Sequence, residues 1–225
     1  MNNTGNLIDE LASRAAPVKP IGSPLARTSI WLASAFAIIA LVVASHGLRA
    51  GLADEFSLPM KLMEWIASVA TGVAAAYAVF HVSVPGRSQR WFYLPFAPFA
   101  LWLATLCWAC VLEYRHAGSA ALAYESASWE CAAAITAMSL PLGLFLLLMV
   151  RHAGVVSPVR TALMAAMSAA TLSASGVTLF HSGETALMVL LWHVGAVALL
   201  CVVSRMLGRK MFAWLGPSTS ATWRS

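Results

Sequence analysis

The sequence predicts an all-α integral membrane protein, a bundle of six transmembrane helices with a short amphipathic helix in front of it. Apolar residues make up 60% of the 225 residues and charged residues only 10%, whereas about 25% of the residues of a soluble domain are charged. Six apolar stretches have about the 18 or more residues that a helix needs to cross a bilayer. They leave only turns and two short tails, so a separate soluble domain is excluded.

Glycine and proline separate the predicted spans. We place the spans at residues 29–46, 61–84, 92–112, 129–150, 160–180 and 185–207. The breaks between them include His46-Gly47, Pro85-Gly86 and Ser157-Pro158. Glycine adopts left-handed conformations and proline lacks an amide donor, so both residues end helices. The chain is thereby divided into a tail of residues 1–27, a transmembrane domain of residues 28–207 and a tail of residues 208–225.

Basic residues are distributed unequally between the two predicted sides of the membrane. Eleven lie on the side of the termini: Arg14, Lys19, Arg27, Arg87, Arg90, Arg151, Arg160, Arg205, Arg209, Lys210 and Arg224. The other side has Arg49, Lys61 and Arg115. Short cytoplasmic segments carry the excess of Lys and Arg, so both termini of this multi-pass protein are predicted to be cytoplasmic. The basic residues then act as topological anchors in contact with the lipid bilayer, and no direct nucleic-acid partner is predicted.

Residues 6–15 of the N-terminal tail are predicted to form a short amphipathic helix. Leu7, Ile8 and Leu11 make an apolar stripe at helical spacing. A helix of about ten residues is rarely stable alone in water, so the stripe needs the bilayer surface, the bundle or a protein groove to cover it. Helices that lie on membranes favour a basic polar face, whereas this one carries Asp9 and Glu10. The acidic face favours a protein partner, although a tail resting on the membrane stays an alternative.

Polar and thiol side chains gather at the predicted outer ends of the helices. Cys131 begins the fourth span, His181 and Ser182 end the fifth, and His46 ends the first. Thiols and imidazoles together bind soft divalent metals, and an accessible thiol can be oxidised. The alternative is that these groups only mark the water interface, where polar residues of helix ends belong.

Other candidate residues lie within the spans. Cys107 and Cys110 are one helical turn apart, which permits redox or metal chemistry but is also common in packing. His81 and His193 lie in or near apolar spans and could ligate a haem, which would make the protein a small membrane redox or transport protein. The sequence has no HExxH, GxSxG or P-loop pattern, so no enzyme and no resident cofactor are predicted.

Several segments resemble those of the NrsF-type anti-sigma factors, which are six-span proteins of the bacterial inner membrane. The segment from Leu7 to Ala12, followed by Pro17-Val18-Lys19-Pro20, resembles the N-terminal segment of the family. The matching later pieces are Val84-Pro85-Gly86-Arg87-Ser88, Cys131 with Ser139-Leu140-Pro141, and Leu191-Trp192-His193.

This resemblance implies a function in transcription regulation. The cytoplasmic N-terminal segment would sequester an extracytoplasmic-function sigma factor, and the docking positions would be Leu7, Ile8, Asp9, Leu11 and Ala12. Periplasmic-side cysteines would sense heavy-metal or oxidative stress and release the partner. A soft or heavy metal ion would then be the signal and not a resident cofactor.

The chain departs from the family at one position of the implied sensor. The family pairs the cysteine at position 131 with a second cysteine, where this chain has Ser182 after His181. A serine forms neither a disulfide nor a strong bond to a soft metal. Sensing through this pair is therefore weakened, whereas docking of the partner is not affected.

Overall fold

The structure is a computed structural model that describes residues 3–14, 21–119, 129–151, 153, 155–181 and 185–215, and these residues are helical with turns between the helices. The long helices are α1 (Asn3–Arg14), α2 (Pro24–His46), α4 (Pro59–Val82), α5 (Phe96–Ala117), α6 (Trp129–Val150), α7 (Pro158–Val177) and α9 (Gly195–Leu215). Short helical segments are α3 (Leu52–Phe56), η1 (Gln89–Tyr93), α8 (Ala186–Val189) and the π-helical turn η4 (Leu190–Val194).

Proline and glycine set several of the helix ends. Pro24, Pro59 and Pro158 occupy the first turns of α2, α4 and α7, where the missing amide hydrogen costs nothing. Ser23 caps α2, because its side chain accepts a hydrogen bond from the amide of Ala26. These signals were readable in the sequence.

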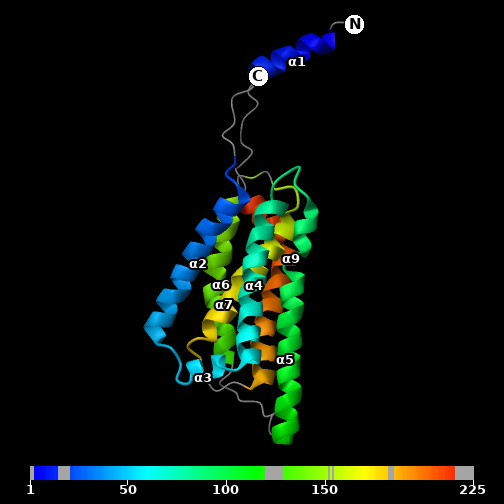
Figure 1. Cartoon of the computed structure of the whole chain (residues 1–225). Coiled ribbons are helices and arrows are strands. Elements are labelled where there is room, and N and C mark those ends of the chain that lie inside the picture. The colour runs from blue at the N-terminus through cyan, green and yellow to red at the C-terminus, as the bar shows by residue number, and fades with distance from the viewer. Residues whose placement is uncertain are drawn as a thin grey trace.

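The long helices alternate in direction along the bundle (Figure 1), so that α2 begins and α9 ends at the same end. We call this the inner end and the opposite one the outer end. The helix α7 packs most extensively, against α4, α9 and α6. Fifteen of its 20 residues are buried, so α7 is the centre of the bundle.

Close helix contacts depend on small residues and cross-helix hydrogen bonds. Ser168 on α7 donates its hydroxyl to the carbonyl of Gly72 on α4 at 2.6 Å, and Ser68 on α4 donates to the carbonyl of Thr171 at 3.2 Å. Small residues let helix backbones approach in lipid, where hydrophobicity cannot drive helices together. The pair of α4 and α7 is thus a tightly bonded unit.

Five segments are long and apolar enough to cross a membrane: Pro24–His46, Pro59–Val82, Gln89–Ala117, Trp129–Val150 and Ala186–Trp214. The predicted fifth span corresponds to α7, which is not among them. Its hydroxyl side chains lower its hydropathy, and several of them donate to backbone carbonyls inside the protein, as Thr171 does to the carbonyl of Met167 at 2.8 Å. The count of six spans therefore stays a prediction.

Some predicted boundaries were wrong. The helix of the first predicted span, α2, begins at Pro24 and not at residue 29. Ser23 caps it and Pro24 suits the first turn of a helix, so both residues favour the earlier start. The last helix continues to Leu215 and does not end at residue 207. The third predicted span is divided into η1 and α5, with Pro95 between them, and it extends to Ala117.

Candidate functional site

The N-terminal helix exposes its whole described surface. Leu7, Ile8 and Leu11 are 53%, 60% and 62% exposed, and the other described side chains of α1 are exposed as well. On the polar face, Glu10 pairs with Arg14 at 2.6 Å. The apolar stripe that the sequence predicts is therefore present on a helix and is uncovered in this structure.

The candidate sensor residues have different environments. Cys131 is completely buried in the core of the bundle, at the outer end of α6, and His181 is half-buried just beyond α7. Ser182 lies outside the described residues. Within the described part of the chain, no group of three or more His, Cys, Asp or Glu side chains could hold a metal ion. An oxidant or metal ion therefore needs the outer end to open before it can reach Cys131.

The remaining cysteines are also placed by the structure. Cys107 is exposed and Cys110 is half-buried on α5, while Cys201 is half-buried on α9. Cys107 lies on a segment that is long and apolar enough to cross a membrane. Its exposed side chain would therefore face lipid.

The two intramembrane histidines lie at opposite ends of the bundle. His81 is near the inner end of α4, where its ring lies 4.6 Å from each of the rings of Tyr77 and Trp91. His193 lies in η4 and lines a pocket with Glu64 of α4, 17 residues before His81. At 1.5 Å per residue this separation is about 25 Å. One haem therefore cannot be ligated by both His81 and His193.

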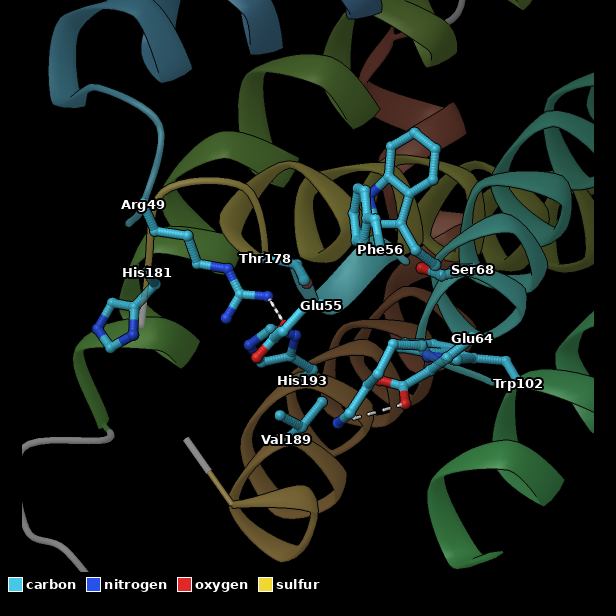
Figure 2. A pocket seen from close by; sticks show the side chains of 12 residues that line it. Arg49, Glu55, Phe56, Glu64, Ser68, Trp102, Thr178, His181, Val189 and His193 are labelled. Atoms are coloured by element: carbon cyan, nitrogen blue, oxygen red, sulfur yellow. Dashed lines mark hydrogen bonds and ion pairs between the residues drawn. The ribbon is translucent and has the colours of Figure 1, made fainter. Parts of the chain in front are cut away.

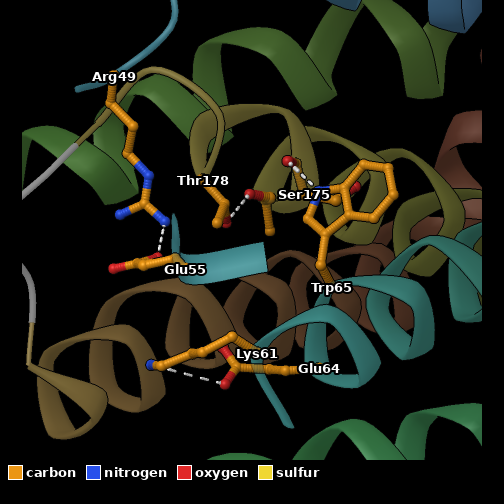
Figure 3. Close-up of polar contacts among 8 residues, drawn as sticks. Arg49, Glu55, Lys61, Glu64, Trp65, Ser175 and Thr178 are labelled. Atoms are coloured by element: carbon orange, nitrogen blue, oxygen red, sulfur yellow. Dashed lines mark hydrogen bonds and ion pairs between the residues drawn. The ribbon is translucent and has the colours of Figure 1, made fainter. Parts of the chain in front are cut away.

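A small polar pocket lies at the outer end of the bundle (Figure 2), with a cavity of about 40 Å³. Its charged and imidazole side chains come from the α2–α3 connection, α3, α4, η4 and the end of α7: Arg49, Glu55, Lys61, Glu64, His181 and His193. The guanidinium of Arg49 pairs with Glu55, and the ammonium of Lys61 lies 3.9 Å from Glu64 (Figure 3). We call these six residues the outer polar cluster.

The outer polar cluster is only partly hydrogen-bonded. Among the described residues, the buried Oε2 of Glu64 and the buried Nε of Arg49 have no hydrogen-bond partner. A partly satisfied polar network in a low-dielectric site is costly. A cavity of about 40 Å³ has room for water between these atoms. The cluster is thus a weak point in an otherwise apolar bundle.

The sequence did not predict that these six residues meet. Arg49 and Lys61 were expected to act as topological anchors, His181 to belong to a sensor with Cys131, and His193 to be a possible haem ligand within a segment that resembles the family. The signal that could have revealed the cluster is Glu64, because it lies inside the predicted span 61–84 and an ionisable residue within a span is a functional candidate by default. The π-helical turn at His193 is a second signal, and it is visible only in the structure.

The fold and these surfaces define a class of protein: a helical bundle with several membrane-spanning candidates, preceded by a helix, α1, whose described side chains are exposed. The chain belongs to the NrsF family, since the family model described as a negative regulator of sigma F matches residues 11–214. No curated protein and no solved structure matches the chain.

Family membership gives the protein a general function. It is a negative regulator of a sigma factor, with a sigma factor as partner, which indicates a regulatory role and not an enzymatic one. The match begins at Leu11, so Leu7, Ile8 and Asp9 precede the matched stretch. The docking role of these three residues is therefore not a consequence of the match.

Proposed function

We propose that the protein is an anti-sigma factor of the bacterial inner membrane that holds an extracytoplasmic-function sigma factor through α1. The single observation that supports this most directly is the uncovered stripe of Leu7, Ile8 and Leu11. Each such side chain gains about 1.5–3 kcal/mol when it is buried, so a partner groove that covers all three would be strongly favoured. Ala12 borders the stripe beside Ile8, whereas Asp9 lies on the polar face, where it would meet a basic rim of the partner groove.

The orientation follows from charge. The described basic residues in the first turn of α2, after α4, after α6, in the first turn of α7 and towards the end of α9 belong to the inner end of the bundle, where α2 begins and α9 ends (Figure 1). An excess of basic residues supports placing this end in the cytoplasm. In that orientation α1 meets a cytoplasmic sigma factor and keeps it at the membrane, away from RNA polymerase.

A docking test uses two substitutions with the same charge on opposite faces of α1. Leu11→Asp places a carboxylate in the stripe, whereas Ser13→Asp places one on the polar face. We expect Leu11→Asp to weaken retention of a purified, tagged sigma factor by membranes about tenfold or more, which corresponds to about 1.4 kcal/mol. Ser13→Asp should retain it. Equal retention by both variants would show that the stripe is not the docking surface.

For the stimulus, we propose that heavy-metal or oxidative stress acts at the outer end, on Cys131 with His181. The family pattern puts a second cysteine where this chain has Ser182, so Ser182→Cys is expected to restore a crosslink to Cys131 under mild oxidant. The crosslink would shift mobility on a non-reducing gel. The control is Ser182→Cys combined with Cys131→Ala. An unshifted band in the test variant would mean that positions 131 and 182 are not adjacent.

A further inference from the structure

The helix α2 connects directly to α1 through residues 15–23, and it makes the least extensive contacts of the long bundle helices. Its buried residues form one stripe at spacings of three or four: Thr28, Trp31, Ala35, Ile39 and Val43. Because only one face of α2 is attached to the bundle, α2 can tilt, and a tilt changes the direction in which the chain enters the helix at Pro24.

The inner end of α2 is fixed by directional contacts. The guanidinium of Arg27 donates a hydrogen bond to the carbonyl of Met149 on α6 and lies 4.7 Å from the ring centroid of Phe80 on α4. The indole Nε1 of Trp31 donates to the carbonyl of Leu142 at 3.3 Å. These contacts hold the first eight residues of α2 against two neighbouring helices.

The outer half of α2 is packed through apolar contacts beside an open groove. The groove has a volume of about 530 Å³ and lies between α2 and the pair of α4 and α7, with Phe36, Ala40 and Ala44 on one side and Val69 and Leu172 on the other. Lipid tails are as apolar as these side chains, so they can replace such contacts with little change in free energy. Figure 1 shows α2 diverging from the bundle towards its outer end.

Polar and aromatic contacts hold the outer end. The ring of His46 stacks on Phe180 with centroids 4.7 Å apart, and the amide of Arg49 donates to the carbonyl of Leu179 at 3.0 Å. The guanidinium of Arg49 pairs with Glu55 in the outer polar cluster (Figure 2). We call these contacts of His46 and Arg49 the outer latch.

The side chain of Arg49 is a suitable release point. It is only 12% exposed, yet its Nε has no hydrogen-bond partner among the described residues. Its partner Glu55 is 42% exposed, and an ion pair with one solvent-accessible partner contributes little to stability. Such a pair can be joined or separated at small cost. The outer latch therefore has a defined closed geometry, and the free energy needed to open it is small.

We infer that α2 is a lever that couples the outer end to α1: the outer latch holds α2 in the position that presents α1 to the sigma factor, and opening of the latch tilts α2 about Arg27 and Trp31. This inference rests on the proposed function, because it assumes that α1 docks the partner. A helix of 23 residues is about 34 Å long, so it spans the distance from the latch to the inner end. The stimulus then needs no change within the rigid α4 and α7 pair.

The first test removes the side-chain pair of Arg49, the release point of the latch. In the full-length protein, Arg49→Ala is expected to lower retention of a purified, tagged sigma factor on membranes about fivefold or more, the usual lower range of coupling between two sites. The matched control is Lys61→Ala, because Lys61 pairs with Glu64 inside α4 and makes no contact in the latch. Unchanged retention with Arg49→Ala, or an equal loss with both variants, would overturn the lever.

The second test fixes α2 in place. A Cβ added at Gly176 on α7 would lie 2.7 Å from Cγ2 of Ile39, so Ile39→Cys with Gly176→Cys is positioned for a crosslink. In the Arg49→Ala background, oxidation of this pair should restore retention, and a reductant should remove it again. The control replaces the second change with Gly176→Ala and should not respond to oxidant. If the crosslink forms and retention is not restored, the lever is wrong. Formation of the crosslink also shows that α2 and α7 still pack together in the Arg49→Ala variant.

The outcome also separates this inference from the proposed function. If Leu11→Asp abolishes retention and the Arg49→Ala result contradicts the lever, docking through α1 stands and only the lever is wrong. If Leu11→Asp has no effect, the proposed function is wrong, whatever the behaviour of Arg49.

Discussion

At the scale of single residues, the bundle depends on a few positions where only glycine leaves enough space. On α4, a Cβ added at Gly72 would lie 2.5 Å from Cγ of Leu172 and 2.9 Å from the hydroxyl oxygen of Thr171. Both neighbours are completely buried, so they have little room to move. By contrast, Gly195 at the start of α9 has nothing within 4 Å of such an added Cβ.

These two glycines give a matched pair of substitutions. Gly72→Ala is expected to lower the free energy of unfolding by about 1–3 kcal/mol, the usual effect of overpacking a core. Gly195→Ala should leave it unchanged or raise it by up to about 1 kcal/mol, because alanine favours a helix. Reversible denaturant unfolding in detergent micelles measures both. If the two variants behave alike, the close approach of α4 and α7 at Gly72 is not as the structure has it.

At the scale of elements, α7 has the least lipid-like composition and the most central place. Its neighbours cover it on nearly all sides, and hydroxyls such as Ser168 and Thr171 bond to backbone carbonyls inside the protein. A helix enclosed in this way does not need the apolar surface that lipid demands of the outer helices. We therefore predict that α7 crosses the membrane despite its low hydropathy.

Thiol labelling tests the path of α7. In a variant whose four native cysteines are replaced by alanine, Val156→Cys and Ser182→Cys place a single thiol before and after the helix. A reagent that cannot cross the membrane should label position 182 in intact cells and position 156 only after permeabilisation. Labelling of both positions from the same side would show that α7 does not span the bilayer.

At the scale of the whole molecule, the protein separates the two proposed tasks between the two ends of one bundle. The docking helix α1 precedes the inner end, whereas Cys131 and the outer polar cluster lie at the other end (Figure 1). The tightly packed α4 and α7 join the two ends as a core that does not involve α1. The bundle should therefore fold without the N-terminal segment.

Deletion of residues 2–16 tests this independence. The shortened protein is expected to lose retention of the sigma factor completely, while its unfolding temperature in detergent stays unchanged, because the described side chains of α1 are exposed and bury nothing in the bundle. Membranes that contain the deletion variant at the same level should release the sigma factor into the soluble fraction. A lowered unfolding temperature would mean that the segment stabilises the bundle, and retained partner would place the docking surface elsewhere.

The sequence by itself determined where most helices begin and end and how charge is divided between the two ends. Pro24, Pro59 and Pro158 begin helices for local backbone reasons, and the bilayer requires long apolar segments that satisfy their own hydrogen bonds. The stripe of Leu7, Ile8 and Leu11 was also readable, because helical spacing alone puts these residues on one face.

Only the tertiary structure decided which helix is central and which side chains meet. Hydropathy does not reveal the central place of α7. Lipid and a protein core are equally apolar, so the apolar content of a helix does not show whether lipid or another helix faces it. For the same reason the convergence of Arg49, Glu64 and His193, from three separate elements, appears only after packing. The burial of Cys131 was likewise hidden, since one thiol at a helix end has the same sequence signal whether it faces lipid, water or protein.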